Sequence, residues 1–208
     1  LGEIANRFFA APSAALAVIG ITGTNGKTTT AWLVTQALEK LGEAAQNPRN
    51  HRYSASRGIP KLREAAAGYY KHRFDVDLDP ETEVISTIGA KEGFSHLMWV
   101  LLDHGDAALV PSPSYPIHIF GPLFAGANVR EIPLGTGDEF FDNMVEAWEY
   151  SHPKPRVIVL SFPHNPTTTC VDLAFMQRVV DFAREKDVVL VHDNAYADLG
   201  FDGYRPPS

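Results

Sequence analysis

Short apolar runs alternate along most of the chain with longer amphipathic stretches. Leu16–Ile21 is a continuous apolar run, which is typical of a buried parallel strand. Further strands are predicted at Glu83–Ile88, Ala107–Pro111, Val129–Pro133, Arg156–Ser161 and Val188–His192. Helical spacing of apolar residues predicts helices at Thr28–Leu41, Pro60–His72, Gly93–Leu102, Phe140–Tyr150 and Leu173–Glu185. This alternation predicts an α/β fold with three layers, α/β/α, around a mostly parallel sheet whose ligands bind beyond the carboxyl ends of the strands.

Composition narrows the class of protein and of partner. The 208 residues suit one large domain or two small ones, and the net charge of −7 argues against nucleic acid or an anionic membrane as the main partner. Cys170 is the single cysteine, so no internal disulfide forms and a reducing, cytoplasmic location is expected. No apolar run near the start is long enough to span a bilayer.

The loop after the first predicted strand reads GTNGKT and has the chemistry of a phosphate-binding loop. Its glycines allow the backbone N–H groups to point inward, Lys27 adds a positive charge, and the Thr28 hydroxyl can hold Mg²⁺ at a helix start. The strict pattern has a glycine where this chain has Ile21. A plain glycine-rich turn is the alternative. The predicted nucleotide-binding residues are Gly23, Thr24, Asn25, Gly26, Lys27 and Thr28, with ATP and Mg²⁺ as ligands.

TGTNGKTT resembles the ATP-binding loop of the Mur ligases, which join an amino acid to a UDP-muramoyl peptide. The resemblance covers residues 1–43 and implies that Lys27 and Thr28 contact the ATP phosphates and that Thr28 ligates Mg²⁺. The further magnesium ligands and the C-terminal domain of a Mur ligase cannot be placed downstream.

Beyond the first helix, different residues with chemical potential follow the predicted strands. Residues 89–91 (GAK) open a helix, where backbone N–H groups can receive a phosphate. Tyr115 stands before a proline in a stiff loop and can stack on an aromatic ring. Asn165 follows another strand, although Asn-Pro is usually a turn former. Asp193 ends the last predicted strand, where a helix cap or turn is the alternative interpretation.

Five segments, NHRYSASRGIPKLREA, TIGAKEGFSHL, PSPSYPIH, SFPHNPTT and VHDNAYADL, resemble the class I and II aminotransferases, which use pyridoxal phosphate (PLP). The nearest resemblance is to the alanine and LL-diaminopimelate type, and it covers residues 44–208. It implies an amino acid and a 2-oxo acid as substrates and a homodimeric assembly. The residues that it implies for PLP are Gly89, Ala90 and Lys91 for the phosphate, Tyr115 for ring stacking, Asn165 and Tyr196 for O3′, and Asp193 for the pyridinium nitrogen.

The lysine that forms the Schiff base in this family follows the D-x-A-Y motif, and the chain reaches Ser208 without a matching lysine. We therefore expect no catalytic residue, weak or absent PLP binding, and an inactive fragment with two cut ends. The alternatives are a Mur-type ligase fragment and an artificial or mis-joined chimera.

In the family's sheet the strand matching Glu83–Ile88 pairs with a later strand. We therefore expect an exposed edge that Leu16–Ile21 repairs or through which copies of the chain self-associate.

The eight histidines show no metal-ligand spacing, so we interpret them as surface or core polar groups. His192 stands at the end of a predicted strand and could line the predicted site, although the sequence does not require it.

Overall fold

The computed structural model describes residues 27–51, 53, 55–135 and 138–208. The chain divides into two compact units, Leu1–Ser54 and Ala55–Ser208. The predicted strand Leu16–Ile21 and the loop residues Gly23, Thr24, Asn25 and Gly26 lie outside the described residues. The part that Leu16–Ile21 was expected to play in the sheet therefore stays a prediction.

The first unit consists, as far as it is described, of helix α2 (Lys27–Ala45) and the short 3₁₀ helix η2 (Pro48–Asn50). The Asn50 side-chain amide donates to the Ala44 carbonyl at 2.8 Å, and His51 Nε2 lies 2.8 Å from the Ala45 carbonyl. Both contacts satisfy carbonyl groups that a helix end leaves without partners. The predicted helix Thr28–Leu41 is confirmed, and it extends one turn further to Ala45.

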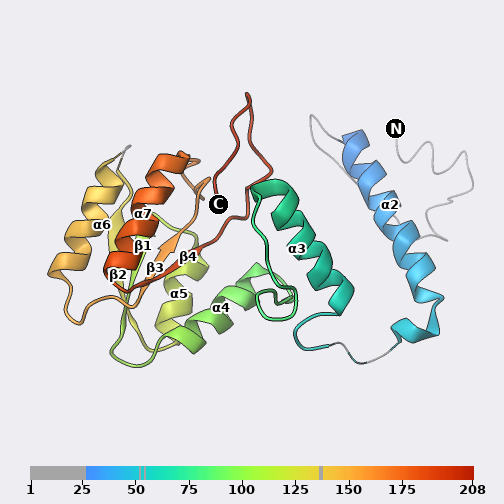
Figure 1. The fold of residues 1–208 in the computed structure, drawn as a ribbon, viewed down its shortest axis with the longest axis horizontal. Coiled ribbons are helices and arrows are strands. Elements are labelled where there is room, and N and C mark those ends of the chain that lie inside the picture. The colour runs from blue at the N-terminus through green and yellow to red at the C-terminus, as the bar shows by residue number, and fades with distance from the viewer. Residues whose placement is uncertain (1–26, 52, 54, 136–137) are drawn as a thin grey trace, which may run out of the picture. The chain divides into compact units, whose positions relative to one another are not determined.

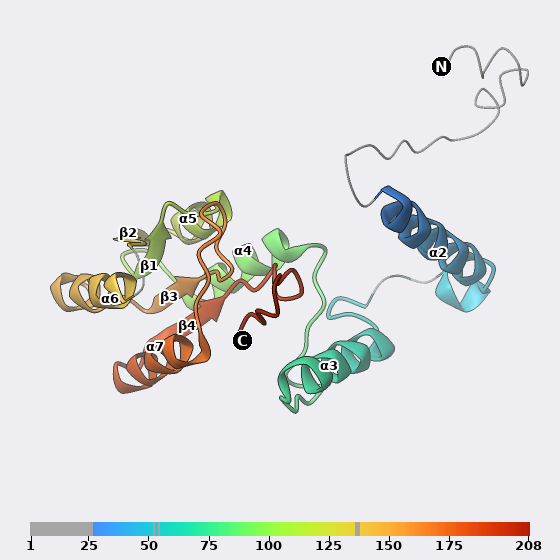
Figure 2. The ribbon, with the colours of Figure 1, turned by 90° about the horizontal axis from the view of Figure 1, so that it is seen from above.

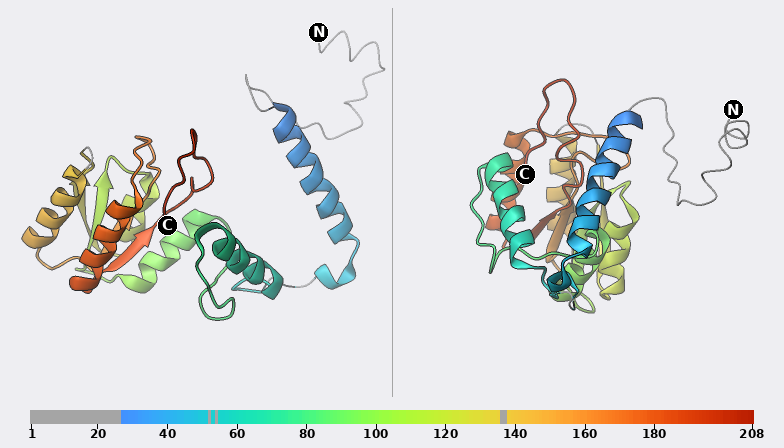
Figure 3. Two further views of the ribbon diagram at one scale, coloured as in Figure 1. Left: turned by 45° about the horizontal axis from the view of Figure 1, so that its top comes forward. Right: turned by 90° about the vertical axis from the view of Figure 1, so that its right-hand side faces the viewer.

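The second unit is built on a four-stranded sheet whose paired strands are all parallel (Figures 1 and 3). The strands are β1 (Ala107–Ser112), β2 (Asn128–Pro133), β3 (Val157–Leu160) and β4 (Val189–His192), in the spatial order β2-β1-β3-β4. The helices are α3 (Pro60–Phe74), α4 (Ala90–Leu101), α5 (Pro116–Phe124), α6 (Glu139–Tyr150) and α7 (Leu173–Glu185). The α/β class is confirmed, and so are four of the predicted strands. Short, mostly apolar runs form β1, β3 and β4, whereas half of the residues of β2 are polar.

Side chains of β1 alternate between two apolar cores, one on each face of the sheet. Leu109 packs in one core with Met144 of α6 and Val179 of α7. Val110 packs in the other with Met98 of α4, and α5 contributes partly buried residues there. Figure 2 shows α5 and α7 on opposite sides of the strands. The predicted three-layer arrangement is therefore present in this unit.

The prediction of a strand at Glu83–Ile88 is wrong. The segment leaves a turn and runs as an irregular loop, with Ile85 and Ile88 exposed. Its backbone is tied to the preceding part of the chain by two hydrogen bonds, from the Glu83 N–H to the Asp79 carbonyl at 2.9 Å and from the Ser86 N–H to the Arg57 carbonyl at 3.1 Å. A strand needs a partner ladder for its N–H and C=O groups, and no described strand lies beside this segment to supply one.

Helix α5 was not predicted, because it contains residues that usually end helices. Pro116 begins it at a position where the missing N–H costs nothing, and Pro122 lies in its last turn. Gly121 lies against α4 so closely that a Cβ atom there would come within 2.9 Å of Phe94 Cε1. This close approach is what joins α5 to α4 on one face of the sheet.

Candidate functional site

Three of the predicted site residues follow the carboxyl ends of neighbouring strands. Tyr115 comes after β1, Asn165 after β3 and Asp193 directly after β4. The chain leaves β1 for β2 on one side and returns to β3 on the other, so a topological switch point lies between β1 and β3. Open α/β sheets bind ligands in the crevice at such a point.

Asp193 is held by both its backbone and its side chain. Its N–H donates to the Leu160 carbonyl at 2.8 Å, which continues the β3–β4 ladder by one residue. One carboxylate oxygen, Oδ2, accepts a hydrogen bond from Nε2 of His118 at 2.8 Å. The His118 side chain is 1% exposed, and its other ring nitrogen lies 3.1 Å from the Ser114 hydroxyl. The carboxylate is therefore fixed in place at the end of the sheet.

His118 is a residue of the site that the sequence analysis missed, because the histidines other than His192 were interpreted as ordinary polar groups. The feature that could have indicated His118 is its position three residues after Tyr115, in the first turn of a helix. That helix was not predicted, so His118 could not be assigned to the same face as Asp193.

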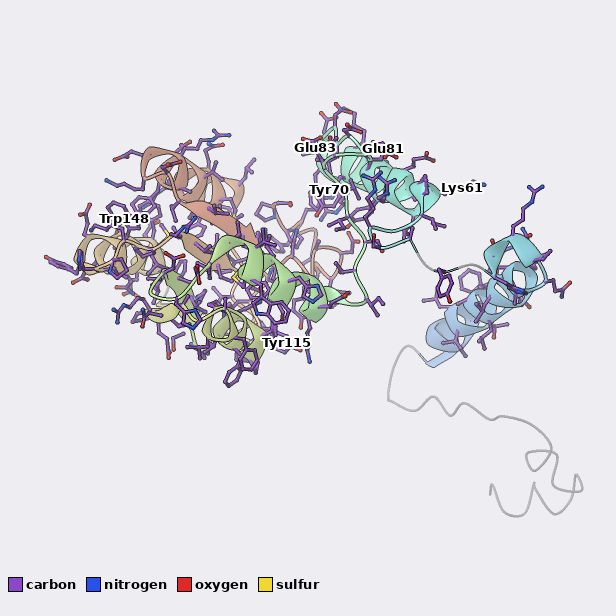
Figure 4. The ribbon with its side chains drawn as sticks, turned by 90° about the horizontal axis from the view of Figure 1, so that it is seen from below. Lys61, Tyr70, Glu81, Glu83, Tyr115 and Trp148 are labelled. Atoms are coloured by element: carbon purple, nitrogen blue, oxygen red, sulfur yellow. The ribbon has the colours of Figure 1, made fainter. Side chains whose placement is uncertain are left out.

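Lys91, in the first turn of α4, lies close to Tyr115, the residue that precedes α5. Figure 4 labels Tyr115. The ammonium nitrogen of Lys91 is 5.4 Å from the centre of the Tyr115 ring, within the range of a cation–π contact. Hydrogen bonding to Tyr115, followed by the charge interaction with it, raises the pKa of Lys91. The Tyr115 ring in turn meets His118 edge-on at 5.9 Å. Lys91, Tyr115, His118 and Asp193 thus form one connected set.

The residues predicted to bind a phosphate, 89–91, form the start of α4. Gly89 precedes the helix with φ of 90°, a conformation that side chains with a Cβ rarely adopt. The Glu92 carboxylate accepts from the Ile88 N–H, and the Thr87 hydroxyl donates to the Gly89 carbonyl at 3.1 Å. These contacts shape the turn. The first N–H groups of a helix have no intrahelical partner and attract anions.

Asn165 and Tyr196 form a second group. The Asn165 side-chain amide donates to the Tyr196 hydroxyl at 3.1 Å, and both residues are half-buried. Tyr196 lies in the turn that directly follows Asp193, closed by the hydrogen bond from the Ala197 N–H to the Asn194 carbonyl at 3.3 Å. The structure therefore brings the site residues predicted in the second unit to one end of the sheet in two groups.

Two more histidines lie between these groups. His192 Nε2 is 3.2 Å from both the backbone nitrogen and the carbonyl oxygen of Phe162. His164 is 2% exposed, and its Nδ1 lies 2.9 Å from the Thr167 hydroxyl. Burial lowers the pKa of both imidazoles, and the neighbouring His118 lowers that of His164 further. Both rings therefore favour the uncharged form at neutral pH.

An apolar cavity of about 510 Å³ adjoins Asn165 and Tyr196. Leu199, Phe201 and Tyr204 form much of its far wall. Asp193 and Tyr115 do not line it, so the cavity lies beside the connected set around Asp193 and does not contain it.

The described residues show neither a metal cluster nor a membrane span. No group of three or more His, Cys, Asp or Glu side chains among them is placed to hold a metal ion. None of the described helices combines the length and apolarity needed to cross a membrane. Lys27 and Thr28 begin α2, but the proposed contacts of these two residues with ATP and Mg²⁺ remain untested.

The family model for aminotransferases of class I and II matches residues 22–207. The chain belongs to this family. Its members depend on PLP, so the aminotransferase interpretation is confirmed at the level of the family. The match also includes Gly23–Thr28, and the comparisons give no support to a Mur ligase segment, an ATP site or a chimera.

Individual relatives agree with this assignment. The chain is 54% identical over 171 residues to the glutamate–pyruvate aminotransferase AlaC of Escherichia coli, covering 82% of this chain and 42% of that protein. It is 44% identical to an LL-diaminopimelate aminotransferase of Desulforudis audaxviator, with 82% and 44% covered. The chain thus spans less than half the length of these relatives.

Solved structures of the family show the same fold. Substrate-bound BacF from Bacillus subtilis matches with a TM-score of 0.71 and 38% identity, over 82% of this chain and 43% of that one. A probable N-succinyldiaminopimelate aminotransferase from Thermus thermophilus matches with a TM-score of 0.71 and 31% identity, over 82% and 46%.

Proposed function

We propose that this chain forms the PLP-binding part of an aminotransferase whose complete form moves an amino group between an amino acid and a 2-oxo acid. The observation that carries the proposal is the Asp193 carboxylate, fixed at the end of β4 by a buried His118 at 2.8 Å. The family supplies the reaction class, and the chain's own residues supply the chemistry described below.

The donor set matches the chemical groups of PLP. The free N–H groups at the start of α4 suit a phosphate dianion, and the Tyr115 ring offers an aromatic face beside it. The Asn165 amide and the Tyr196 hydroxyl can share a phenolic oxygen such as O3′. When it is bound, PLP supplies an electron sink that stabilises negative charge on the substrate's α-carbon.

The Asp193–His118 pair would keep that electron sink effective. The His118 N–H donates to one carboxylate oxygen of Asp193 at 2.8 Å and so fixes the direction in which the carboxylate points. A charged carboxylate beside the ring nitrogen of PLP favours the protonated pyridine. In this proposal Asp193 binds the cofactor, and His118 orients the carboxylate from behind.

The test is a titration of the purified chain with PLP, followed by equilibrium dialysis. We expect Asp193→Asn to weaken binding by about 10- to 150-fold, because a hydrogen bond to a charged group contributes about 1.5–3 kcal/mol. Asp187→Asn is the matched control, since Asp187 is exposed near the same strand and Asn also tolerates its positive φ. If the unmodified chain fails to bind PLP at millimolar concentration, the proposal is wrong.

We further propose that this chain binds PLP without turning over amino acids. None of its lysines occupies a position matching the family's Schiff-base lysine. A coupled assay with an amino acid donor and a 2-oxo acid acceptor should therefore show no transfer above that of free PLP. Transfer that saturates with substrate and disappears in Asp193→Asn would contradict this part of the proposal.

A further inference from the structure

We propose that Tyr69 and Arg73 of α3 are positioning residues for the cofactor site, which they serve by clamping the turn that carries Tyr196. The inference rests on the proposed PLP function. It concerns residues of α3 that the sequence analysis did not single out.

Two side chains of α3 hold one carboxylate in the segment after β4, and Figure 1 shows this segment beside α3. The Tyr69 hydroxyl donates to Asp198 Oδ2 at 2.8 Å. Arg73 Nε donates to Asp198 Oδ1 at 3.1 Å. Each oxygen of the carboxylate therefore has its own donor from the same helix face, since residues four apart lie on one side of a helix.

Arg73 also holds the backbone of this turn. Its Nη2 donates to the Ala197 carbonyl at 2.8 Å, and Ala197 is buried. The Arg73 side chain is 19% exposed and the Asp198 side chain 61% exposed, so the hydrogen bond to the Ala197 carbonyl is better shielded from water than the ion pair with Asp198. A guanidinium group can make both contacts at once because its donors are arranged in a rigid plane.

The clamped residues are adjacent to Tyr196 in the chain. The Ala197 N–H donates to the Asn194 carbonyl at 3.3 Å, and the Leu199 N–H donates to the Tyr196 carbonyl at 3.0 Å. The turn is thus closed by its own hydrogen bonds and fixed from outside by α3. Its rigidity sets where the Tyr196 hydroxyl stands, and Asn165 donates to that hydroxyl.

The charges favour a closed clamp at neutral pH. Hydrogen bonds from Tyr69 and then Arg73 lower the pKa of Asp198, so its carboxylate stays charged. The same hydrogen bond raises the pKa of Tyr69, so its phenol keeps the proton that it donates. Both effects preserve the donor and acceptor roles that the geometry requires.

The experiment compares Arg73→Met with unmodified protein by two independent measurements. Hydrogen–deuterium exchange reports the protection of the backbone N–H groups of Ala197 and Leu199, and equilibrium dialysis reports the affinity for PLP. We expect faster exchange at these two groups together with about tenfold weaker PLP binding, because a turn that loses its hydrogen bonds from α3 holds Tyr196 less firmly. Tyr69→Phe removes a single hydrogen bond and should give a smaller change of the same kind.

Lys71→Gln is the matched control, since Lys71 is on the same helix and pairs with the exposed Asp75 and Asp77. It should leave both measurements unchanged. If Arg73→Met fails to fold by circular dichroism, Tyr69→Phe decides the question. Unchanged PLP affinity in a folded clamp variant overturns the inference, whereas an unmodified chain that binds no PLP overturns the proposed function itself.

Discussion

At the scale of single residues, the site depends on His118, a buried side chain whose role is to hold another residue. Its ring lies between the Ser114 hydroxyl and the Asp193 carboxylate and touches the rings of Phe94 and Tyr115. The position of His118 requires both hydrogen-bonding nitrogens, toward Ser114 and Asp193, and a flat ring that packs against Phe94 and Tyr115. Few other side chains meet both requirements.

We therefore predict that His118→Phe lowers the free energy of unfolding by about 1–3 kcal/mol, because the carboxylate loses its buried donor although the ring volume is kept. Urea denaturation followed by circular dichroism measures the change. His152→Gln, at an exposed histidine, should stay within about 0.5 kcal/mol of the unmodified chain. An equally small effect of His118→Phe would show that the pair is dispensable for folding.

The buried histidines also predict how stability depends on pH. Burial lowers the pKa of His164 and His192, so the unfolded chain takes up protons at a higher pH than the folded chain does. Stability from these groups is thus present above the ordinary histidine pKa and is lost as the pH falls below it. We expect the melting temperature to drop between about pH 7 and pH 5.5.

The double variant His164→Gln, His192→Gln should flatten this pH dependence. The carboxylates whose pKa is lowered, such as Asp198, act at lower pH, near their own unfolded values. A slope that is unchanged in the double variant would assign the effect to other groups.

At the scale of elements, the packing of α5 on α4 sets the position of Tyr115 and His118. A Cβ at Gly121 would meet Phe94 Cε1 at 2.9 Å and Met98 Cγ at 3.3 Å. We predict that Gly121→Val lowers the free energy of unfolding by about 1–3 kcal/mol, because the crowded helices must move apart.

Gly68→Ala provides the opposite control. Gly68 lies within α3, and no neighbouring side chain of the described residues comes within 4 Å of the place that a Cβ would take there. Alanine should therefore stabilise the chain by about 0.5–1 kcal/mol. Thermal unfolding of the two variants measures both effects. Stabilisation by both would mean that α5 can shift away from α4 without cost.

Element predictions from the sequence succeeded where one local signal was sufficient. The strands β1, β3 and β4 coincide with short, largely apolar runs, and α7 has the predicted bounds Leu173–Glu185. The prediction failed at Glu83–Ile88, because pairing is not encoded locally and this segment has no described partner. It also failed at α5, whose glycine and prolines are explained by packing on α4 and not by helix propensity.

At the scale of the whole molecule, apolar side chains gather on the outer side of α4 and α5. Trp99, Val100 and Phe124 line one hollow there, and Val100 and Phe124 are more than two-thirds exposed. Soluble monomers rarely expose such a patch, and those that do tend to associate. This apolar surface is therefore an alternative to the sheet edges as the place where copies of the chain associate.

We predict that the double variant Val100→Lys, Phe124→Lys associates less than the unmodified chain. Sedimentation velocity at micromolar concentrations should then give a lower average mass of the particles in solution. Tyr150→Lys changes an exposed aromatic residue on α6 and serves as the control. If the mass stays high in the double variant, association through the edge strands β2 and β4 is the better explanation.

The candidate site, like the helices and strands, could be predicted only in part from the sequence. Tyr115, Asn165 and Asp193 follow apolar strands, so their common end of the sheet could be inferred. The partners His118, Tyr69 and Arg73 could not, because they come from helix faces whose packing only the folded chain defines.

The hydrogen bond from Asp193 to Leu160 has a consequence for the accuracy with which this protein must fold. Successive residues of an extended strand face opposite ways, so a slip of β4 by one residue against β3 would replace the carboxylate with His192 or Asn194. The slipped chain would keep almost all of its strand pairing and lose the negative charge at that position. Under the proposed function, the register of β4 against β3 therefore decides the chemistry of the site: a chain with β4 out of register would lack the carboxylate proposed to bind a protonated ring nitrogen.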